Sequence, residues 1–204
     1  MTIRRVNVVL VAIIAGLLAS GCSVTDSLVG AMPAAMRDAA EKLRAGNATG
    51  AFAELDKAIA ERPNDPTVYL AAAQVCLEGK RPDRAVTYAE RGLQASPGAK
   101  AAIHAQLHSI KGTALLEMGD VKGSVPSHRA AWRLMPEEPV YLNNLAFALA
   151  ELAENDVSLA EAEQLARDAV DKATKAQAPG QTLGVFLDTL GWVQFRRGDL
   201  HSAS

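Results

Sequence analysis

Small side chains recur seven residues apart along much of the chain, inside segments whose apolar positions follow a helical period. Seven residues are two turns of an α-helix, so both small side chains lie on one face of the helix. The pairs are Ala51 and Ala58, Ala85 and Gly92, and Ser124 and Ala131. Five residues after each pair comes a proline, which ends the helix because it has no N–H to donate and clashes with the preceding turn. These prolines are Pro63, Pro97 and Pro136.

Five further helices are predicted, three ahead of the helices above and two further along the chain, and each carries a small residue near its middle. These residues are Ala39, Ala73, Gly112, Ala146 and Gly191. The distance from each of these residues to the first small residue of the next helix is twelve positions in the first, second, third and fifth copies. It is sixteen in the fourth copy, where Ala162 follows Ala146. Two antiparallel helices need small side chains where they approach most closely, with bulkier ones above and below to fill the space. The pattern therefore predicts a chain of antiparallel helix pairs.

Three insertions interrupt the regular spacing. The third copy has five extra residues before Gly112, which we expect to extend its first helix around residues 101–106. The fourth copy has four extra residues, which we place in its internal turn near residues 154–158. Seven more lie around residues 176–182, where Pro179-Gly180 predicts the turn of a loop.

Two further departures from the pattern affect single helices. Pro126 falls inside the second helix of the third copy, so we expect that helix to begin late or to kink. The fifth copy, FLDTLGWVQFRRGDLHSAS, reaches only the start of its second helix. Because an end repeat exposes the face meant for a neighbour, either the natural chain is longer or another surface covers Trp192, Val193 and Phe195.

These features resemble the tetratricopeptide repeat, a helix–turn–helix unit of 34 residues. The resemblance covers about residues 34–204. It divides them into repeats at about 34–65, 66–99, 100–138, 139–175 and 183–204, the last of which is incomplete. The resemblance implies an all-α fold, a right-handed solenoid of antiparallel helix pairs whose first helices line the concave side.

The first 21 residues have the layout of a secretory signal peptide. Arg4 and Arg5 precede an apolar run from Val6 to Leu18, and small residues follow at positions 19–21. The run is shorter than the roughly 20 residues that a membrane span needs. Cys22 comes next, and the stretch LASGC at positions 18–22 resembles the lipobox of bacterial lipoproteins.

The lipobox resemblance implies cleavage before Cys22, a diacylglyceryl thioether on its sulfur, and an acylated new N-terminus, with chains such as palmitate. Stable membrane anchoring takes more than one acyl chain, and a modified Cys22 would carry at least two. Residues 22–33 would then form a flexible tether. Ser23 after the cysteine is similar to the enterobacterial rule for delivery to the outer membrane. The alternative is an uncleaved signal anchor from Val6 to about Val24.

Charge and cysteine content narrow the range of partners. The formal net charge is −2, and it becomes −4 without residues 1–21, which hold Arg4 and Arg5 and no acid. A weakly acidic chain lacks the basic patch that is typical of nucleic-acid-binding proteins. With Cys22 modified, Cys76 has no disulfide partner, and its apolar neighbours predict a small buried side chain.

No motif of the sequence indicates catalysis. His104 and His108 stand four residues apart on a predicted helix, but HAQLH lacks the glutamate of a zinc-protease motif and no third ligand is obvious. The glycine and serine residues form neither a phosphate-binding loop nor a G-x-S-x-G motif. We therefore predict that the protein is not an enzyme and has no metal or cofactor apart from the covalent lipid on Cys22.

The concave side implied by the resemblance is the expected partner-binding surface. Residues of the first helices that face neither their partner helix nor the next repeat should line it. They are Leu70, Gln74, Ser109, Thr113, Asn143, Phe147, Asp188, Trp192 and Phe195. Aromatic anchors with a few hydrogen-bonding groups are typical of peptide-binding grooves. The alternative is that Phe147 and Trp192 pack between repeats and that Asn143 and Asn144 face solvent without a ligand.

The sequence thus favours a lipid-anchored scaffold or assembly factor of the cell envelope. It would sit on the periplasmic side of a membrane, the outer membrane by the sorting rule, and bind segments of partner proteins in its groove. A second hypothesis is a regulator that docks a peptidoglycan enzyme. A third is the remnant of a longer repeat protein whose activity lay downstream of Ser204.

Overall fold

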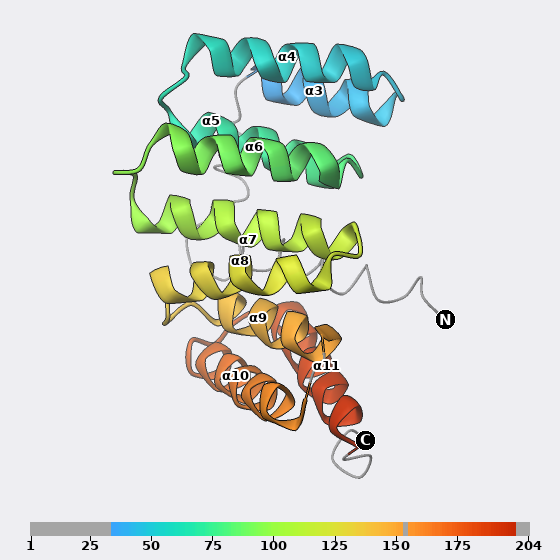
Figure 1. Ribbon diagram of the computed structural model, residues 1–204, viewed down its shortest axis with the longest axis vertical. Helices are drawn as coiled ribbons and strands as arrows, with labels where there is room; N and C mark the ends of the chain where they lie inside the picture. Colours follow the sequence, from blue (N-terminus) through green and yellow to red (C-terminus); the bar gives the residue numbers. More distant parts are fainter. Residues whose placement is uncertain (1–33, 153–154, 199–204) are drawn as a thin grey trace.

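The computed structural model describes residues 34–152 and 155–198, and every regular element in these ranges is an α-helix. The predicted signal peptide, Cys22 and the tether lie outside the described residues. The helices are α3 (Ala34–Arg44), α4 (Ala48–Glu61), α5 (Pro66–Glu78), α6 (Pro82–Ala95), α7 (Ala101–Glu117), α8 (Val121–Leu134), α9 (Pro139–Leu152), α10 (Asp156–Lys175) and α11 (Gly180–Arg197). Figure 1 shows them stacked in one column, from α3 and α4 at one end to α10 and α11 at the other.

Neighbouring helices along the chain pack as antiparallel pairs, which are α3 with α4, α5 with α6, α7 with α8, and α9 with α10. Each pair also contacts the next, and the first helices α3, α5, α7, α9 and α11 touch one another in that order. The prediction of an all-α array of helix pairs is confirmed.

The small residues lie in the interior, as their role at close helix contacts requires. Ala51, Ala85 and Ala162 are fully buried on the second helices, and Ala73 and Ala146 are fully buried on the first helices. The side chains above and below fill the remaining space, since Leu55 and Leu145 are also fully buried.

The third pair uses a different combination of sizes at the same contact. A Cβ atom on Gly112 of α7 would lie 2.7 Å from ring atoms of His128 of α8, and His128 is fully buried. In the second pair the matching positions, also sixteen residues apart, hold Ala73 and Ala89. A glycine and a large ring thus replace two alanines, and the ring occupies the space that the glycine leaves.

The prolines end the second helices in the predicted way. Arg62, Ser96 and Met135 follow α4, α6 and α8, with φ of −139°, −142° and −138° and ψ of 63°, 72° and 69°. Each stands before a proline, whose ring disfavours the helical region for the residue ahead of it. The same local restriction therefore ends all three helices in the same geometry.

The turn inside each of the first three pairs contains three residues, and the middle residue has the same backbone geometry in all three. Gly46 and Gly119 have φ of 79° and 84° in the turns after α3 and α7, and Lys80 has φ of 57° at the matching position after α5. Positive φ is the left-handed region, which glycine occupies without the steric clash of a Cβ atom. Lys80 is therefore strained where the other two turns are not.

The insertions mainly lengthen helices. Helix α7 is extended at its start, as predicted for residues 101–106. Our placement of four extra residues in the turn of the fourth copy, near residues 154–158, is wrong in part, because residues 156–158 already belong to α10. Helix α10 instead begins early, where Asn155 Oδ1 accepts a hydrogen bond from Ser158 N at 2.9 Å. The predicted loop at residues 176–182 is likewise shorter, since α11 begins at Gly180.

Pro126 does not delay the start of α8, so that part of our expectation is wrong. The helix begins at Val121, five residues before the proline. Asp120 fixes this start, because its Oδ1 accepts a hydrogen bond from Gly123 N at 2.8 Å. The helix continues past Pro126 without the hydrogen bond that a backbone N–H would donate there.

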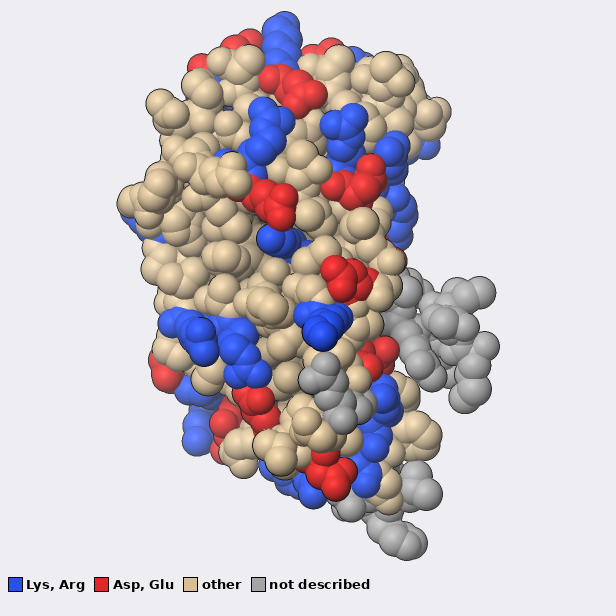
Figure 2. All heavy atoms as spheres, viewed as in Figure 1, with Lys and Arg blue, Asp and Glu red and all other residues tan. Residues whose placement is uncertain are grey.

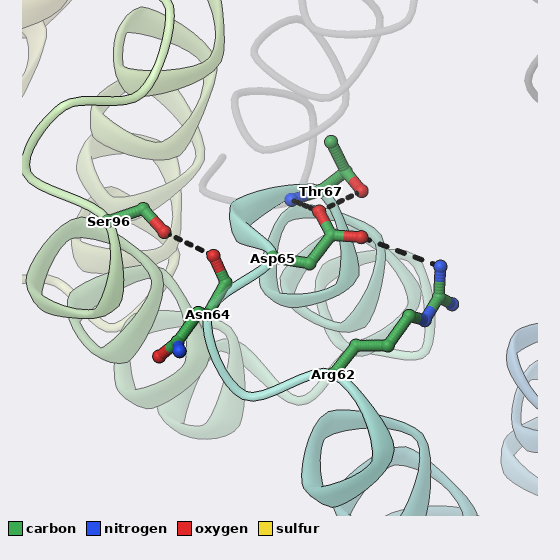
Figure 3. A network of polar contacts seen from close by, with 5 residues as sticks. All are labelled: Arg62, Asn64, Asp65, Thr67 and Ser96. Atoms are coloured by element: carbon green, nitrogen blue, oxygen red, sulfur yellow. Dashed lines mark hydrogen bonds and ion pairs between the residues drawn. The ribbon is translucent and has the colours of Figure 1, made fainter.

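The turns that join successive pairs are also bonded to each other (Figure 3). Asp65 Oδ1 accepts hydrogen bonds from Thr67 N at 2.9 Å and from Thr67 Oγ1 at 2.6 Å, which caps α5. Ser96, at the end of the next pair, donates to the Asn64 carbonyl at 2.5 Å.

The buried side chains form two clusters, and α7 contributes Leu107 and Ile110 to one and Ala105 to the other. The array is therefore continuous through α7.

Replacing Lys80 with glycine should stabilise the protein. The substitution removes the left-handed strain of a residue with a Cβ atom, partly offset by the greater freedom of glycine in the unfolded chain, and we expect a gain of about 0.5 kcal/mol. Gly119→Ala is the matched control and should cost about 1 kcal/mol for the converse reason. Urea unfolding of the three proteins measures both changes, and a less stable Lys80→Gly protein would contradict the strain.

Candidate partner-binding surface

The first helices of the pairs form one continuous inner surface, because each of them contacts the next. We expected nine residues on these helices to line a groove open to partners. The structure separates them into a buried group near the middle of the array, a half-buried pair on α5, and a group on α11 of which Asp188 and Phe195 are exposed.

Four of the nine are buried, so our placement of these residues on an open groove is wrong. They are Ser109, Thr113, Asn143 and Phe147. The physical reason lies mainly in α9, which is contacted by α7, α8, α10 and α11 and is buried from Val140 to Ala150. Phe147 therefore packs in the interior, as in our alternative, whereas Asn143 and Asn144 are not solvent-facing.

The buried polar residues tie neighbouring first helices together only in part. Asn144 Nδ2 donates a hydrogen bond to Ser109 Oγ at 3.2 Å, which links α9 to α7. Thr113 Oγ1 and Asn143 Oδ1 are shielded from solvent and have no hydrogen-bond partner in the part of the chain that the structure describes. Buried oxygen atoms without a hydrogen-bond partner destabilise a fold, and these two atoms lie on the first helices α7 and α9.

Two predicted residues of α5 are half-buried and are already engaged within the protein. Leu70 packs against the core cluster of the first three pairs. Gln74 Nε2 donates a hydrogen bond to Glu78 Oε1 at 3.2 Å, one turn further along the same helix. This end of the inner surface therefore offers few free groups for binding.

The remaining predicted residues lie on α11, where Trp192 is half-buried against the core cluster of the last pairs, as in our alternative. Trp192 and Phe195 are stacked with ring centroids 5.5 Å apart and an interplanar angle of 22°, and half of the Phe195 surface is exposed. We call these two residues the aromatic platform. Asp188 is exposed one turn before Trp192. Of the nine candidates, these three form the cluster that a partner can reach.

Sequence reasoning missed the basic side chain of this cluster. The guanidinium carbon of Arg196 lies 5.5 Å from the ring centroid of Trp192, and Arg196 pairs with Glu151 of α9 at 3.9 Å. The signal was present, because residues four apart on a helix are neighbours and arginine over a tryptophan ring is a favourable contact. Trp, Phe and Arg together have the composition of an interface hot spot.

Charge on the rest of the molecule is balanced. Figure 2 shows basic and acidic side chains alternating over the face in view. Ion pairs join neighbouring helix pairs, among them Arg91 of α6 with Asp56 of α4 at 3.2 Å, and Lys111 of α7 with Glu90 of α6 at 2.8 Å. No single-sign patch is visible on this face, in line with the weak net charge of the sequence.

The histidines and the cysteine offer no metal site in the described ranges. No three side chains of His, Cys, Asp or Glu gather there closely enough to hold a metal ion. His104 Nε2 lies 2.8 Å from the Ser96 carbonyl, so this ring is engaged in a hydrogen bond. Burial raises the pKa of the Cys76 thiol to about 12, and a thiol held neutral in this way is a poor nucleophile and ligand.

Comparison with known proteins identifies the architecture. The family model of the tetratricopeptide repeat matches residues 42–107, which run from the end of α3 into α7. A structure of MamA from Desulfovibrio magneticus RS-1 superposes with a TM-score of 0.60 at 21% identity, covering 83% of this chain and 86% of that one. The fold is a tetratricopeptide-repeat solenoid.

Other comparisons add no activity to this assignment. A second MamA structure has a TM-score of 0.60 at 13% identity, covering 83% of this chain and 84% of that one. At these identities the likeness concerns the fold of the tetratricopeptide-repeat solenoid alone. Among curated proteins, no sequence match reaches significance. Among residues 34–152 and 155–198, none of the helices is long and apolar enough to cross a bilayer.

Acidification should destabilise the protein through His128. Burial lowers the pKa of this fully buried ring from 6.5 to about 4, so between these values the unfolded chain binds a proton that the folded chain does not. Stability should therefore fall as the pH drops below 6.5, by about 2 kcal/mol at pH 5.

Urea unfolding at pH 7 and pH 5 isolates this contribution when the natural protein is compared with His128→Leu. The variant should lose the His128 part of the pH dependence. His104→Gln should keep it. An equal drop in stability for the natural protein and His128→Leu would contradict the role of the buried ring.

Proposed function

We propose that this protein is a scaffold or assembly factor that binds partner proteins on the inner helices of its solenoid while a lipid on Cys22 anchors it to a membrane of the cell envelope. The observation that supports partner binding is the aromatic platform of α11, in which the half-buried Trp192 is stacked on the half-exposed Phe195 beside Arg196, with the exposed Asp188 one turn earlier. A stacked aromatic pair on a rigid helix gives a partner an apolar contact with little ordering of side chains.

The partner that fits this surface is a protein segment with an apolar anchor. Its apolar side chain would lie on Phe195, and its polar groups would meet Asp188 and Arg196. The unsatisfied Thr113 Oγ1 and Asn143 Oδ1 lie too deep to join this contact in the conformation described here. They therefore play no part in the proposed binding.

Membrane attachment rests on the sequence LASGC at positions 18–22. The proposed location is the periplasmic face of the outer membrane. Anchoring confines the solenoid and its partner to one surface, which raises the effective concentration of each for the other. This is the physical advantage that an anchored scaffold has over a free one.

Cys22→Ser should release the protein from membranes or leave its precursor uncleaved. The thioether cannot form on a hydroxyl, so the acyl chains that hold the protein would be missing. Membrane fractionation and the intact mass of the protein measure both effects. Cys76→Ala is the matched control and should stay in the membrane fraction. Unchanged acylation and fractionation of Cys22→Ser would refute the anchor.

Trp192→Ala should remove the partner without unfolding the protein. Truncating a hot-spot aromatic weakens binding by about 2 kcal/mol or more, a loss of at least tenfold. Crosslinking in native membranes, followed by mass spectrometry, measures the amount and identity of the bound protein. Recovery of a peptidoglycan enzyme would indicate the regulatory role, and recovery of secretin or pilin subunits would indicate assembly.

The control for this experiment is Trp132→Ala, which changes the other tryptophan, on the second helix α8. It should keep the partner even if it lowers the melting temperature. If Trp192→Ala kept its partner, or if it lowered the melting temperature as much as truncation of the fully buried Phe186, the platform would be a packing feature instead of a binding site.

A further inference from the structure

The last turn of α11 carries two adjacent arginines, and each is held by an acid of a different helix. Arg196 Nη1 lies 3.9 Å from Oε1 of Glu151, on the last turn of α9. Arg197 pairs with Glu163 of α10. The side chains of the two acids keep only 18% and 11% of their surface exposed. Salt screens ion pairs that are shielded in this way much less than it screens exposed pairs.

Arg196 departs from the charge pattern of the other first helices. The residues at its position on α5, α7 and α9 are Glu78, Glu117 and Glu151, each five residues after the small residue near the helix centre. The earlier first helices therefore carry acids at matching positions. Only between α9 and α11 does an acid meet a base there, and the two side chains form an ion pair.

Glu163 departs from the pattern of the second helices. It follows the small residue Ala162, and the matching positions of α4, α6 and α8 hold Phe52, Val86 and Val125. Those three side chains are apolar, and each is buried or partly buried. Burying an acid at such a position is costly unless a cation pairs with it. The acid on α10 thus makes this position depend on its arginine partners.

The carboxylate of Glu163 joins an arginine of its own helix to one of α11. Arg167, one turn further along α10, donates to Glu163 Oε1 from Nη2 at 2.6 Å and from Nε at 3.1 Å. The other carboxylate oxygen, Oε2, faces Arg197. One oxygen is therefore used within α10, and the other holds the end of α11.

The aromatic platform lies in the same part of α11 as these arginines. Both arginines directly follow Phe195, and the guanidinium carbon of Arg196 lies 5.5 Å from the ring centroid of Trp192. Among the helices in the described ranges, α11 contacts only α9 and α10. Each of its two neighbours thus holds one arginine next to the platform.

We propose that Glu151 and Glu163 are positioning residues for the aromatic platform, which they orient through the two arginines of α11. Attachment to two different helices fixes both the place and the rotation of the last turn, whereas a single contact would leave the turn free to pivot. Arg196 carries the effect to the ring of Trp192, on which its guanidinium lies. This role rests on the proposed function, because orientation matters only if a partner binds the platform.

The fluorescence and circular dichroism of Trp192 measure the orientation of the platform without a partner. The whole chain with Trp132→Phe keeps Trp192 as its one tryptophan. In this protein Glu151→Gln should release Arg196 from α9, since the amide has the shape of the acid but no charge. Acrylamide should then quench Trp192 more strongly, and the near-ultraviolet circular dichroism of the stacked rings should weaken.

Glu161→Gln is the matched control. It breaks the pair of Glu161 with Arg129, at 2.5 Å, which joins α10 to α8 and does not involve α11. A fall in melting temperature that both variants share belongs to the loss of an ion pair between helices. The signals of Trp192 should change in Glu151→Gln and stay unchanged in the control.

Recovery of the partner by crosslinking in native membranes gives the functional measurement. Glu151→Gln and Glu163→Gln should each lower the recovered amount about fivefold, as expected when a residue acts on a binding site through one neighbour. Arg196→Gln should also lower recovery. Adding Glu151→Gln to Arg196→Gln should cause no further loss, because the acid acts through the arginine.

Three results would overturn the positioning role. The first is a lower melting temperature of Glu151→Gln and Glu163→Gln with unchanged Trp192 signals and recovery, which would mean that the acids only stabilise the last helix. The second is an equal loss of partner in Glu161→Gln. The third is a further loss when Glu151→Gln is added to Arg196→Gln.

The variant Trp192→Ala separates this role from the proposed function. If Trp192→Ala keeps its partner, the proposed function fails whatever the acids do. If Trp192→Ala loses the partner while Glu151→Gln and Glu163→Gln keep it, the platform binds and the positioning role alone fails.

Discussion

The close approach of antiparallel helices through small side chains is the constraint on which the rest of this structure depends. Ala73, Ala85, Ala146 and Ala162 are fully buried because the helix backbones leave no room for larger groups at these positions. The third pair shows that the constraint acts on the combined size of the two facing side chains. Glycine at position 112 and histidine at position 128 fill the space that two alanines fill elsewhere. The positions of the contact are kept while the residues change.

Stacking of the pairs then decides which side chains a partner can reach. Helix α9 is enclosed by four other helices, so its polar residues are in the interior. Among the described helices α11 contacts only α9 and α10, so Phe195 and Asp188 remain exposed on it although Phe186 is fully buried. The proposed partner-binding surface lies on α11 for this reason. The inner helices near the other end are occupied by their own contacts, such as the bond between Gln74 and Glu78.

The sequence was sufficient to predict the helix pairs, because spacing and proline position are local features. Pro63, Pro97 and Pro136 restrict the residue before them, and this restriction needs no tertiary contact. Exposure was harder to predict. Periodicity placed Thr113 and Asn143 on the correct helices, but their burial depends on how many helices surround them. The contact of Arg196 with Trp192 follows helix spacing and was within reach of sequence reasoning.

The three-residue turn within each of the first three helix pairs has a consequence for how such an array grows. Extra residues in the third and fourth pairs enter as added helical turn at the ends of α7 and α10. Four residues are close to one full turn, so the face that meets the partner helix keeps its orientation. Added length therefore extends single helices while the face that meets the neighbouring helix stays the same.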